Sequence, residues 1–223
     1  MTLPRLTTGR LVLRPFTRDD EAVHHLVFAD PRVAGPYCGA TRTLEEVRAW
    51  LVHRALQAAE DDLGFWAVVR GADDALLGLV ALQPYVPWWI VWEHDPTARH
   101  RRVEVELSYA LGRRHWGGGY ATEAGRALVA YAFETLRLPR IAFGVDGANA
   151  RSVGVMRRLG FRLERNLHPD DPGGVVGVLD NTGSERTARA PLPGVSLRGA
   201  LRRFAPATPT GTTAARAGGG CRR

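Results

Sequence analysis

Three consecutive glycines stand directly before a helical pattern in the stretch RRHWGGGYATEAG, residues 113–125. Small and apolar residues that recur at helical spacing predict a helix over about 121–136. The first turn of a helix leaves backbone N–H groups without partners and carries about half a positive charge, so it attracts anions. Glycines there let the main chain approach a ligand that a Cβ would keep away. The stretch therefore predicts a phosphate or pyrophosphate site, with a turn shaped for packing alone as the alternative.

Two nucleotide-binding motifs are excluded as the source of this site. All 30 basic residues are arginines, so the chain lacks the lysine of a Walker A loop and any lysine that could form a Schiff base or anchor pyridoxal phosphate. The dinucleotide fingerprint GxGxxG, started at Gly117, would need its last glycine at Thr122. That fingerprint also follows the first strand of a βαβ unit, whereas this turn follows about the fourth strand.

The remaining patterns predict an α/β fold with a mixed sheet of about seven strands and about four helices. Thr17 with Asp20 and Thr43 with Glu46 resemble helix starts, and Asp30-Pro31 is expected to end the first helix. The predicted strands are 10–16, 65–70, 76–83, 103–111, 140–145, 161–166 and 174–181, and the predicted helices are 17–29, 44–59, 121–136 and 150–159.

The strand predicted at 103–111, VEVELSYAL, carries two carboxylates. Its residues alternate, so Glu104, Glu106 and Ser108 share one face, opposite a face that is apolar except for the hydroxyl of Tyr109. Two carboxylates on one face can supply a general base. The alternative is that both simply face solvent.

Charge is distributed unevenly along the chain. Residues 1–183 hold 22 Arg against 22 Asp and Glu, whereas residues 184–223 hold 8 Arg and one Glu, which accounts for the net charge of +7. We therefore expect a neutral domain at 1–183 and a disordered tail rich in Arg, Pro and Gly at 184–223. The tail could touch RNA or an acidic membrane surface. The expectation is a solvated extension, without a nucleic-acid or membrane partner.

Several other classes of site are not indicated. Cys38 and Cys221 make no disulfide framework, and Cys38 is expected to be a small loop residue rather than a nucleophile. The seven histidines form no metal-binding motif, so no metal is expected. No signal peptide and no run of 18 apolar residues is present, which favours a cytoplasmic protein.

The segment from VELSYAL through WGGGYATEAG to GANARSVGVMRRLGF resembles the acetyl-CoA core of the GNAT N-acetyltransferases. It is similar to the branch of the Rim-type ribosomal-protein N-terminal acetyltransferases, as are TGRLVLRPFTRDD and ADPRVAG near the N-terminus. The resemblance covers about residues 6–181. It implies the GNAT fold, in which the fourth and fifth strands splay apart.

The resemblance also implies where acetyl-CoA binds. Backbone amides of the glycine turn would hold the pyrophosphate, and the splayed fourth strand would hydrogen-bond the pantetheine arm like an added strand. Arg114, Arg126 and Arg151 could meet the phosphates or could be ordinary exposed arginines. The cofactor-binding residues implied in this way are Tyr109, Ala110, Leu111, Trp116, Gly117, Gly118, Gly119, Tyr120, Ala121, Thr122, Asn149 and Ser152.

Catalysis on this resemblance needs a base and a group to assist the leaving thiolate. Glu106 matches the glutamate that the family carries on this strand and is the expected base, directly or through water, with Glu104 as the fallback. Met156 stands where many family members have a tyrosine, so Ser152 is the candidate for the thiolate, with water as its rival.

The sequence leaves the acceptor open. A primary amine is expected, either a protein N-terminus or a small molecule, and segments 31–43, 84–100 and 165–174 are expected to set specificity. Trp88, Trp89 and Trp92 could form an aromatic lip for a substrate, a homodimer contact, or ordinary packing. A non-catalytic acyl-CoA-binding regulatory module is the alternative function, and an RNA- or ribosome-associated protein acting through its tail is a third.

Overall fold

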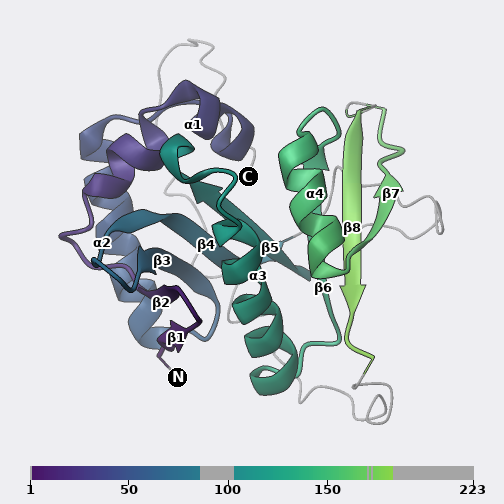
Figure 1. Ribbon diagram of the computed structural model, residues 1–223, viewed down its shortest axis with the longest axis horizontal. Coiled ribbons are helices and arrows are strands. Elements are labelled where there is room, and N and C mark those ends of the chain that lie inside the picture. Colours follow the sequence, from purple (N-terminus) through teal and green to yellow (C-terminus); the bar gives the residue numbers. More distant parts are fainter. Residues whose placement is uncertain (1, 86–102, 170, 172, 183–223) are drawn as a thin grey trace, which may run out of the picture.

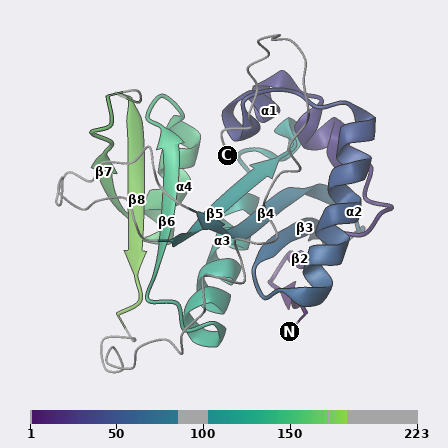
Figure 2. The same ribbon diagram turned by 180° about the vertical axis from the view of Figure 1, so that it is seen from behind.

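The computed structural model describes residues 2–85, 103–169, 171 and 173–182, and the strands of this part form one mixed eight-stranded sheet (Figures 1 and 2). The order across the sheet is β1-β2-β3-β4-β5-β6-β8-β7, and only β5 and β6 are parallel neighbours. The strands are Leu6–Thr7 (β1), Leu11–Pro15 (β2), Gly64–Arg70 (β3), Leu76–Tyr85 (β4), Glu104–Leu111 (β5), Arg140–Asp146 (β6), Arg162–Arg165 (β7) and Gly174–Asp180 (β8).

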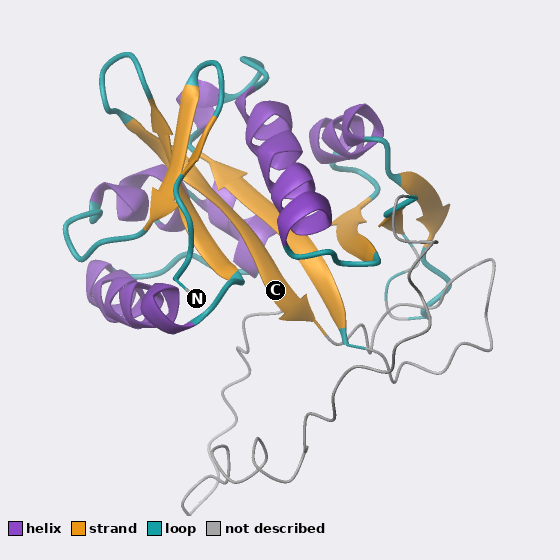
Figure 3. Cartoon of the chain, turned by 90° about the horizontal axis from the view of Figure 1, so that it is seen from below, coloured by secondary structure: helices purple, strands orange, loops and turns teal. Residues whose placement is uncertain are grey.

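Helices cover both faces of the sheet (Figure 3). Helices α1 (Pro31–Cys38) and α2 (Leu44–Glu60) lie on one face, and α3 (Tyr120–Ala130) and α4 (Ala150–Leu159) lie on the other. The alternation of β3 shows the division, because Trp66 packs with residues of α3 and α4 whereas Ala67 packs with residues of α1 and α2. Two buried clusters therefore lie on opposite faces of the same sheet.

The sheet opens between β5 and β6. Strand β5 pairs along its whole length with β4, from Glu104 opposite Tyr85 to Leu111 opposite Gly78. Its parallel pairing with β6 is limited to Glu106 opposite Ala142. Beyond that pair the two strands diverge, as Figure 1 shows, so the edge of β5 that faces β6 is not used by the sheet. The predicted splay and the mixed α/β fold are confirmed; the additional strand is the two-residue β1.

The second predicted helix is also confirmed and has the expected start. Thr43 Oγ1 accepts a hydrogen bond from the Glu46 amide at 3.2 Å, while the Glu46 carboxylate accepts one from the Thr43 amide at 2.7 Å. This reciprocal arrangement satisfies backbone groups that the first turn of α2 would otherwise leave unpaired.

The first predicted helix is wrong in extent. The structure has a short π-helical segment, His24–Phe28, and then a separate helix α1 that begins where an end was expected. Asp30 caps α1 by accepting a hydrogen bond from the Arg32 amide at 3.0 Å, and Pro31 occupies the first turn, where its missing N–H costs nothing. Cys38, expected in a loop, is the buried last residue of this helix.

Some expectations fall outside the described residues. The tail at 184–223 and the tryptophans Trp88, Trp89 and Trp92 belong to this group. Within the described part of the chain, no helix is long and apolar enough to cross a membrane.

Candidate active site

The glycine turn has backbone dihedral angles that glycine adopts more easily than other residues. Gly117 and Gly119 have φ angles of 78° and 79°, which place both in the left-handed region. Gly119 is the N-cap of α3 and provides no side-chain hydrogen bond, unlike the caps of α1, α2 and α4. The Glu123 amide donates to Gly119 O at 3.0 Å, so the amides of residues 120–122 precede the first intrahelical bond. This helix start therefore presents N–H groups to a ligand.

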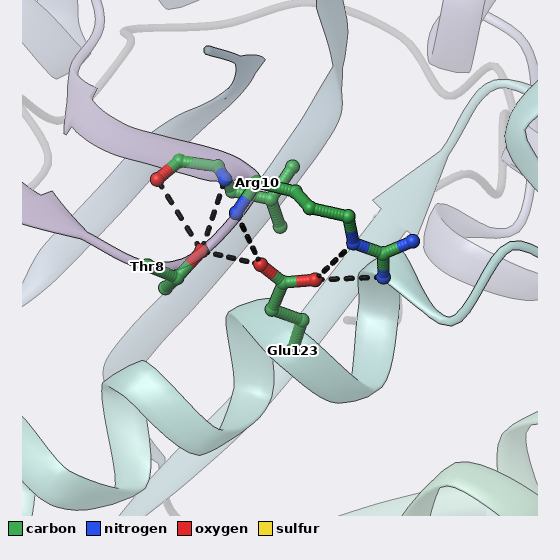
Figure 4. A network of polar contacts seen from close by, with 4 residues as sticks. Thr8, Arg10 and Glu123 are labelled. Atoms are coloured by element: carbon green, nitrogen blue, oxygen red, sulfur yellow. Dashed lines mark hydrogen bonds and ion pairs between the residues drawn. The ribbon is translucent and has the colours of Figure 1, made fainter. Parts of the chain in front are cut away.

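A network of polar contacts fixes this first turn against the turn between β1 and β2 (Figure 4). The Glu123 carboxylate accepts hydrogen bonds from Thr8 Oγ1 at 2.6 Å, from the Arg10 amide at 2.9 Å and from Arg10 Nε at 2.7 Å. Arg10 also lies over the Tyr120 ring, with Cζ 4.6 Å from the centroid. Burial alone would raise the pKa of Glu123, but the hydrogen bonds from Thr8 and Arg10 outweigh it and lower the pKa.

The network has an electrostatic consequence for the helix start. Glu123 is the only acidic residue in the first turn of α3, and a free carboxylate there would repel an anionic ligand. Arg10 neutralises it with an ion pair at 2.7 Å. The sequence offered no signal for this contact, because Thr8 and Glu123 are 115 residues apart.

A cavity of about 660 Å³ lies beside the glycine turn and is lined by arginines. Its lining comes from three segments: α1, the short 3-10 helix Arg113–His115 with the Trp116 that follows it, and the first turn of α4. No carboxylate is among the described residues of the lining, and four of these residues are arginines, so this part of the cavity is cationic. The lining residues are Arg32, Arg113, Arg114, Trp116 and Arg151.

The sequence left open whether Arg114, Arg126 and Arg151 meet phosphates or are ordinary exposed arginines. Arg114 and Arg151 line the cavity, whereas Arg126 does not. Arg32 and Arg113 were not singled out from the sequence, although they lie in the stretches ADPRVAG and RRHWGGGYATEAG. Arg113 is oriented by an ion pair of 3.7 Å with Asp30, the cap of α1.

Arg114 is oriented by its neighbour in sequence. Its Nε donates to His115 Nε2 at 3.0 Å. His115 is buried, and burial together with the Arg114 charge lowers its pKa, which keeps the ring neutral and able to accept. Guanidinium groups held in this way suit phosphate oxygens.

The two carboxylates of β5 are both buried, so they do not form a solvated face. Glu104 is 6% exposed and Glu106 is 3% exposed. Glu104 forms an ion pair with Arg140 of β6, including a hydrogen bond from Arg140 Nε at 2.8 Å. Glu106 accepts a hydrogen bond from Gln83 Nε2 at 3.3 Å and stands at the last paired position before β5 and β6 diverge. Glu104 is thus committed to a structural pair, and Glu106 lies at the opening of the sheet.

Residues 109–111 continue β5 along the edge of the opening, as expected. The carbonyl of Leu111 is already used, because Trp116 Nε1 donates to it at 2.7 Å. By strand alternation Tyr109 projects to the face covered by α3 and α4, opposite to the face of Glu106 and Ala110. A ligand passing between β5 and β6 would therefore have Glu106 on one side of the sheet and Tyr109 on the other.

Helix α4 carries the remaining expected residues. Asn149 is its cap, and the Asn149 side chain accepts a hydrogen bond from the Ser152 amide at 3.2 Å. Ser152 faces Tyr109 across the opening, close enough to influence the pKa of that phenol. Met156 is fully buried in the core and cannot act on a ligand. Asn149 thus has a structural role that the sequence did not indicate.

No group of three or more His, Cys, Asp or Glu side chains suited to a metal ion occurs among the described residues. The chemistry that the site offers comes from main-chain amides, arginines, one carboxylate at the opening and two hydroxyls.

Comparisons with known proteins agree with this geometry. A family model described as "Acetyltransferase (GNAT) domain" matches residues 10–162. The uncharacterized N-acetyltransferase YoaA of Bacillus subtilis (strain 168) is 26% identical over 162 residues, which is 72% of this chain and 84% of that protein. A GNAT-family acetyltransferase from Bacillus anthracis has a TM-score of 0.63 at 20% identity, over 80% of this chain and 99% of that chain. Ribosomal-protein-S5-alanine acetyltransferase from Vibrio fischeri has a TM-score of 0.59 at 16% identity, over 80% of this chain and 97% of that chain.

Proposed function

The chain belongs to the acetyltransferase (GNAT) domain family, and from that membership we propose that it transfers the acetyl group of acetyl-CoA to a primary amine. The family match and the N-acetyltransferase relative identify it as an N-acetyltransferase. The single observation that carries the proposal is the uncapped start of α3 beside an arginine-lined cavity. We propose that the domain occupies residues 1–183 of a cytoplasmic protein.

The residues of the site fit acetyl-CoA. The amides of the turn from Trp116 to Thr122 would hold the pyrophosphate, with Arg114 and Arg151 as cationic partners. The edge of β5 from Tyr109 onward would hydrogen-bond the pantetheine arm through main-chain groups that the sheet does not use. The thioester supplies an activated acetyl group, and it would reach the position where β5 and β6 part.

The amine must be neutral to attack the thioester. At pH 7, loss of its proton costs an α-amino group with a pKa of about 8 roughly 1.4 kcal/mol, and a lysine side chain at about 10.4 roughly 4–5 kcal/mol. Glu106 is buried at the opening and can take this proton directly or through a water molecule. A backbone N–H of β5 would polarise the thioester carbonyl as an oxyanion-type donor.

The proposed amine acceptor depends on the branch of the family to which the chain is assigned. We propose that the chain belongs with the Rim-type enzymes and that its acceptor is a protein N-terminus, with a small amine as the second candidate. The WGGGYATEAG motif supports this branch, and the fold of a ribosomal-protein acetyltransferase from Vibrio fischeri is compatible with it. An α-amino group also needs less deprotonation energy than a lysine side chain.

Two measurements test the proposed function. Calorimetry with acetyl-CoA should show saturable binding, and thiol release should be detected with at least one member of a panel of N-terminal peptides, polyamines and aminoglycosides. Glu106→Gln should bind acetyl-CoA as the unmodified protein does but lose most turnover. Tight binding with no turnover across the panel would instead support a regulatory acyl-CoA-binding module, and no binding at all would refute the proposal.

A further inference from the structure

The hydroxyl of Tyr109 is a buried polar group without a normal hydrogen bond. Its oxygen is inaccessible to solvent and has no hydrogen-bond partner within the described part of the chain. The ring packs against Phe143 of β6, with 5.7 Å between the centroids, so it lies where the two strands part. An unsatisfied buried hydroxyl costs about 1–3 kcal/mol. A ligand atom that accepts a hydrogen bond at this position would satisfy the hydroxyl.

Ser152 is the side chain that faces Tyr109. It stands in the first turn of α4, and its amide is held by Asn149. Burial raises the pKa of Tyr109 to about 12, and Ser152 lowers it in part. The Tyr109 oxygen has no hydrogen bond of normal geometry, and Ser152 lowers its pKa as a donor to that oxygen does, so the Tyr109 O–H remains available to a third group.

We propose that Tyr109 donates a hydrogen bond to the thiolate sulfur released in acyl transfer, together with Ser152. This inference rests on the proposed function. Tyr109 comes from β5, and Ser152 comes from the helix that follows β6. Donors from the two sides of the opening can converge on an atom that lies between them, which is where the proposed pantetheine path places the sulfur.

The leaving thiolate needs a group that donates a hydrogen bond to sulfur, not a group that transfers a proton to it. As the tetrahedral intermediate collapses, the C–S bond breaks and its electron pair stays on sulfur. The nitrogen loses its second proton to Glu106, which has by then passed the first proton, taken from the ammonium group, to water. A thiolate whose thiol has a pKa of about 8.5 is a weaker base than a phenolate whose phenol has a pKa of about 12, so Tyr109 keeps its proton. The thiolate takes its own proton from water after release.

The test compares binding of CoA with binding of desulfo-CoA, which lacks the sulfur, by calorimetry at pH 8.5. About half of a free thiol is ionised at this pH. The unmodified protein should prefer CoA, and Tyr109→Phe should reduce the preference about tenfold without changing the affinity for desulfo-CoA. The turnover number should fall by a similar factor at unchanged KM for acetyl-CoA.

Tyr131→Phe is the matched control. Tyr131 is also buried, but its hydroxyl donates to the Asp62 carbonyl at 3.1 Å, away from the opening. This variant should leave the preference for CoA unchanged.

A second variant keeps the inference testable if Tyr109→Phe does not fold. Ser152→Ala leaves Tyr109 in place, so it should retain part of the preference for CoA, whereas complete loss would show Ser152 to be the sole donor. A preference that survives Tyr109→Phe would overturn the inference and leave the proposed function intact. Failure of both CoA and desulfo-CoA to bind would instead refute the proposed function.

Discussion

The Arg151 guanidinium lies over the Trp116 indole, with its Cζ 5.0 Å from the ring centroid. Trp116 opens the glycine turn before α3, and Arg151 stands in the first turn of α4. The contact therefore joins the turn that precedes α3 to the start of α4 at the arginine-lined cavity, and the flat ring limits the orientations of the guanidinium. Arg151 is thus held at the cavity without a carboxylate partner among the contacts that the structure shows.

Removal of this charge should weaken binding of acetyl-CoA. We expect Arg151→Gln to raise the Kd about fivefold at low salt, because it removes a charge-assisted hydrogen bond at an exposed site. The effect should shrink as ionic strength rises. Arg157→Gln, a change at an exposed arginine in the last turn of the same helix, is the control and should leave the Kd unchanged. Equal effects of both variants at every salt concentration would contradict a specific role for Arg151.

The glycine turn should tolerate alanine poorly. Gly117 and Gly119 both have φ near 80°, where an added Cβ costs about 1–2 kcal/mol. Open space surrounds the Cβ position of Gly117, so Gly117→Ala isolates backbone strain. We expect Gly117→Ala and Gly119→Ala to lower both the melting temperature and the affinity for acetyl-CoA. Gly9→Ala is the control, since Gly9 has neither a positive φ nor a close neighbour; a similar loss of affinity in that variant would argue against the turn as the binding element.

The two buried carboxylates of β5 should separate into a catalytic and a structural group. We expect Glu106→Gln to reduce the turnover number by about a hundredfold or more while the Kd for acetyl-CoA stays the same. Glu104→Gln should lower the free energy of unfolding, because Arg140 loses the anion with which it pairs. Urea unfolding and thiol release measured on both variants check this division. The reverse result, with turnover lost only in Glu104→Gln, would assign the base to Glu104.

The sequence could predict features whose cause is local. A helix that starts after glycines, strands that alternate and the Thr43–Glu46 capping box all depend on residues within a few positions of one another. These features gave the order of the elements, whereas the opening in the sheet was implied by the resemblance to the GNAT family.

Features that depend on residues far apart in the chain could not be predicted from the sequence. Asp30-Pro31 begins a helix as readily as it ends one, because aspartate caps and proline fits the first turn. The alternation of β5 left open whether its two carboxylates face solvent, whereas in the structure Glu104 is buried and pairs with Arg140, 36 residues away. The pairing of Arg10 with Glu123 spans 113 residues, so it left no local pattern.

The Glu123 network gives a prediction for the pH dependence of stability. The folded-state pKa of Glu123 is lowered by Thr8 and Arg10 against the opposing effect of burial. The unfolded chain therefore binds the proton more readily, so the stabilisation is present above the unfolded pKa of about 4.5 and is lost as pH falls through the folded pKa. Arg10 is 51% exposed, which reduces the expected contribution to about 1 kcal/mol.

Glu123→Gln tests that prediction by urea unfolding between pH 7 and pH 3.5. The variant should be less stable than the unmodified protein at pH 7, and the difference should shrink below about pH 4.5 because the carboxylate of the unmodified protein becomes protonated. Glu134→Gln, a change at an exposed carboxylate later in the same helical segment, should show no such difference. A difference that grows as the pH falls would mean that the network destabilises the ionised carboxylate. That outcome would also remove the reason for placing a neutralised Glu123 beside the anion-binding turn.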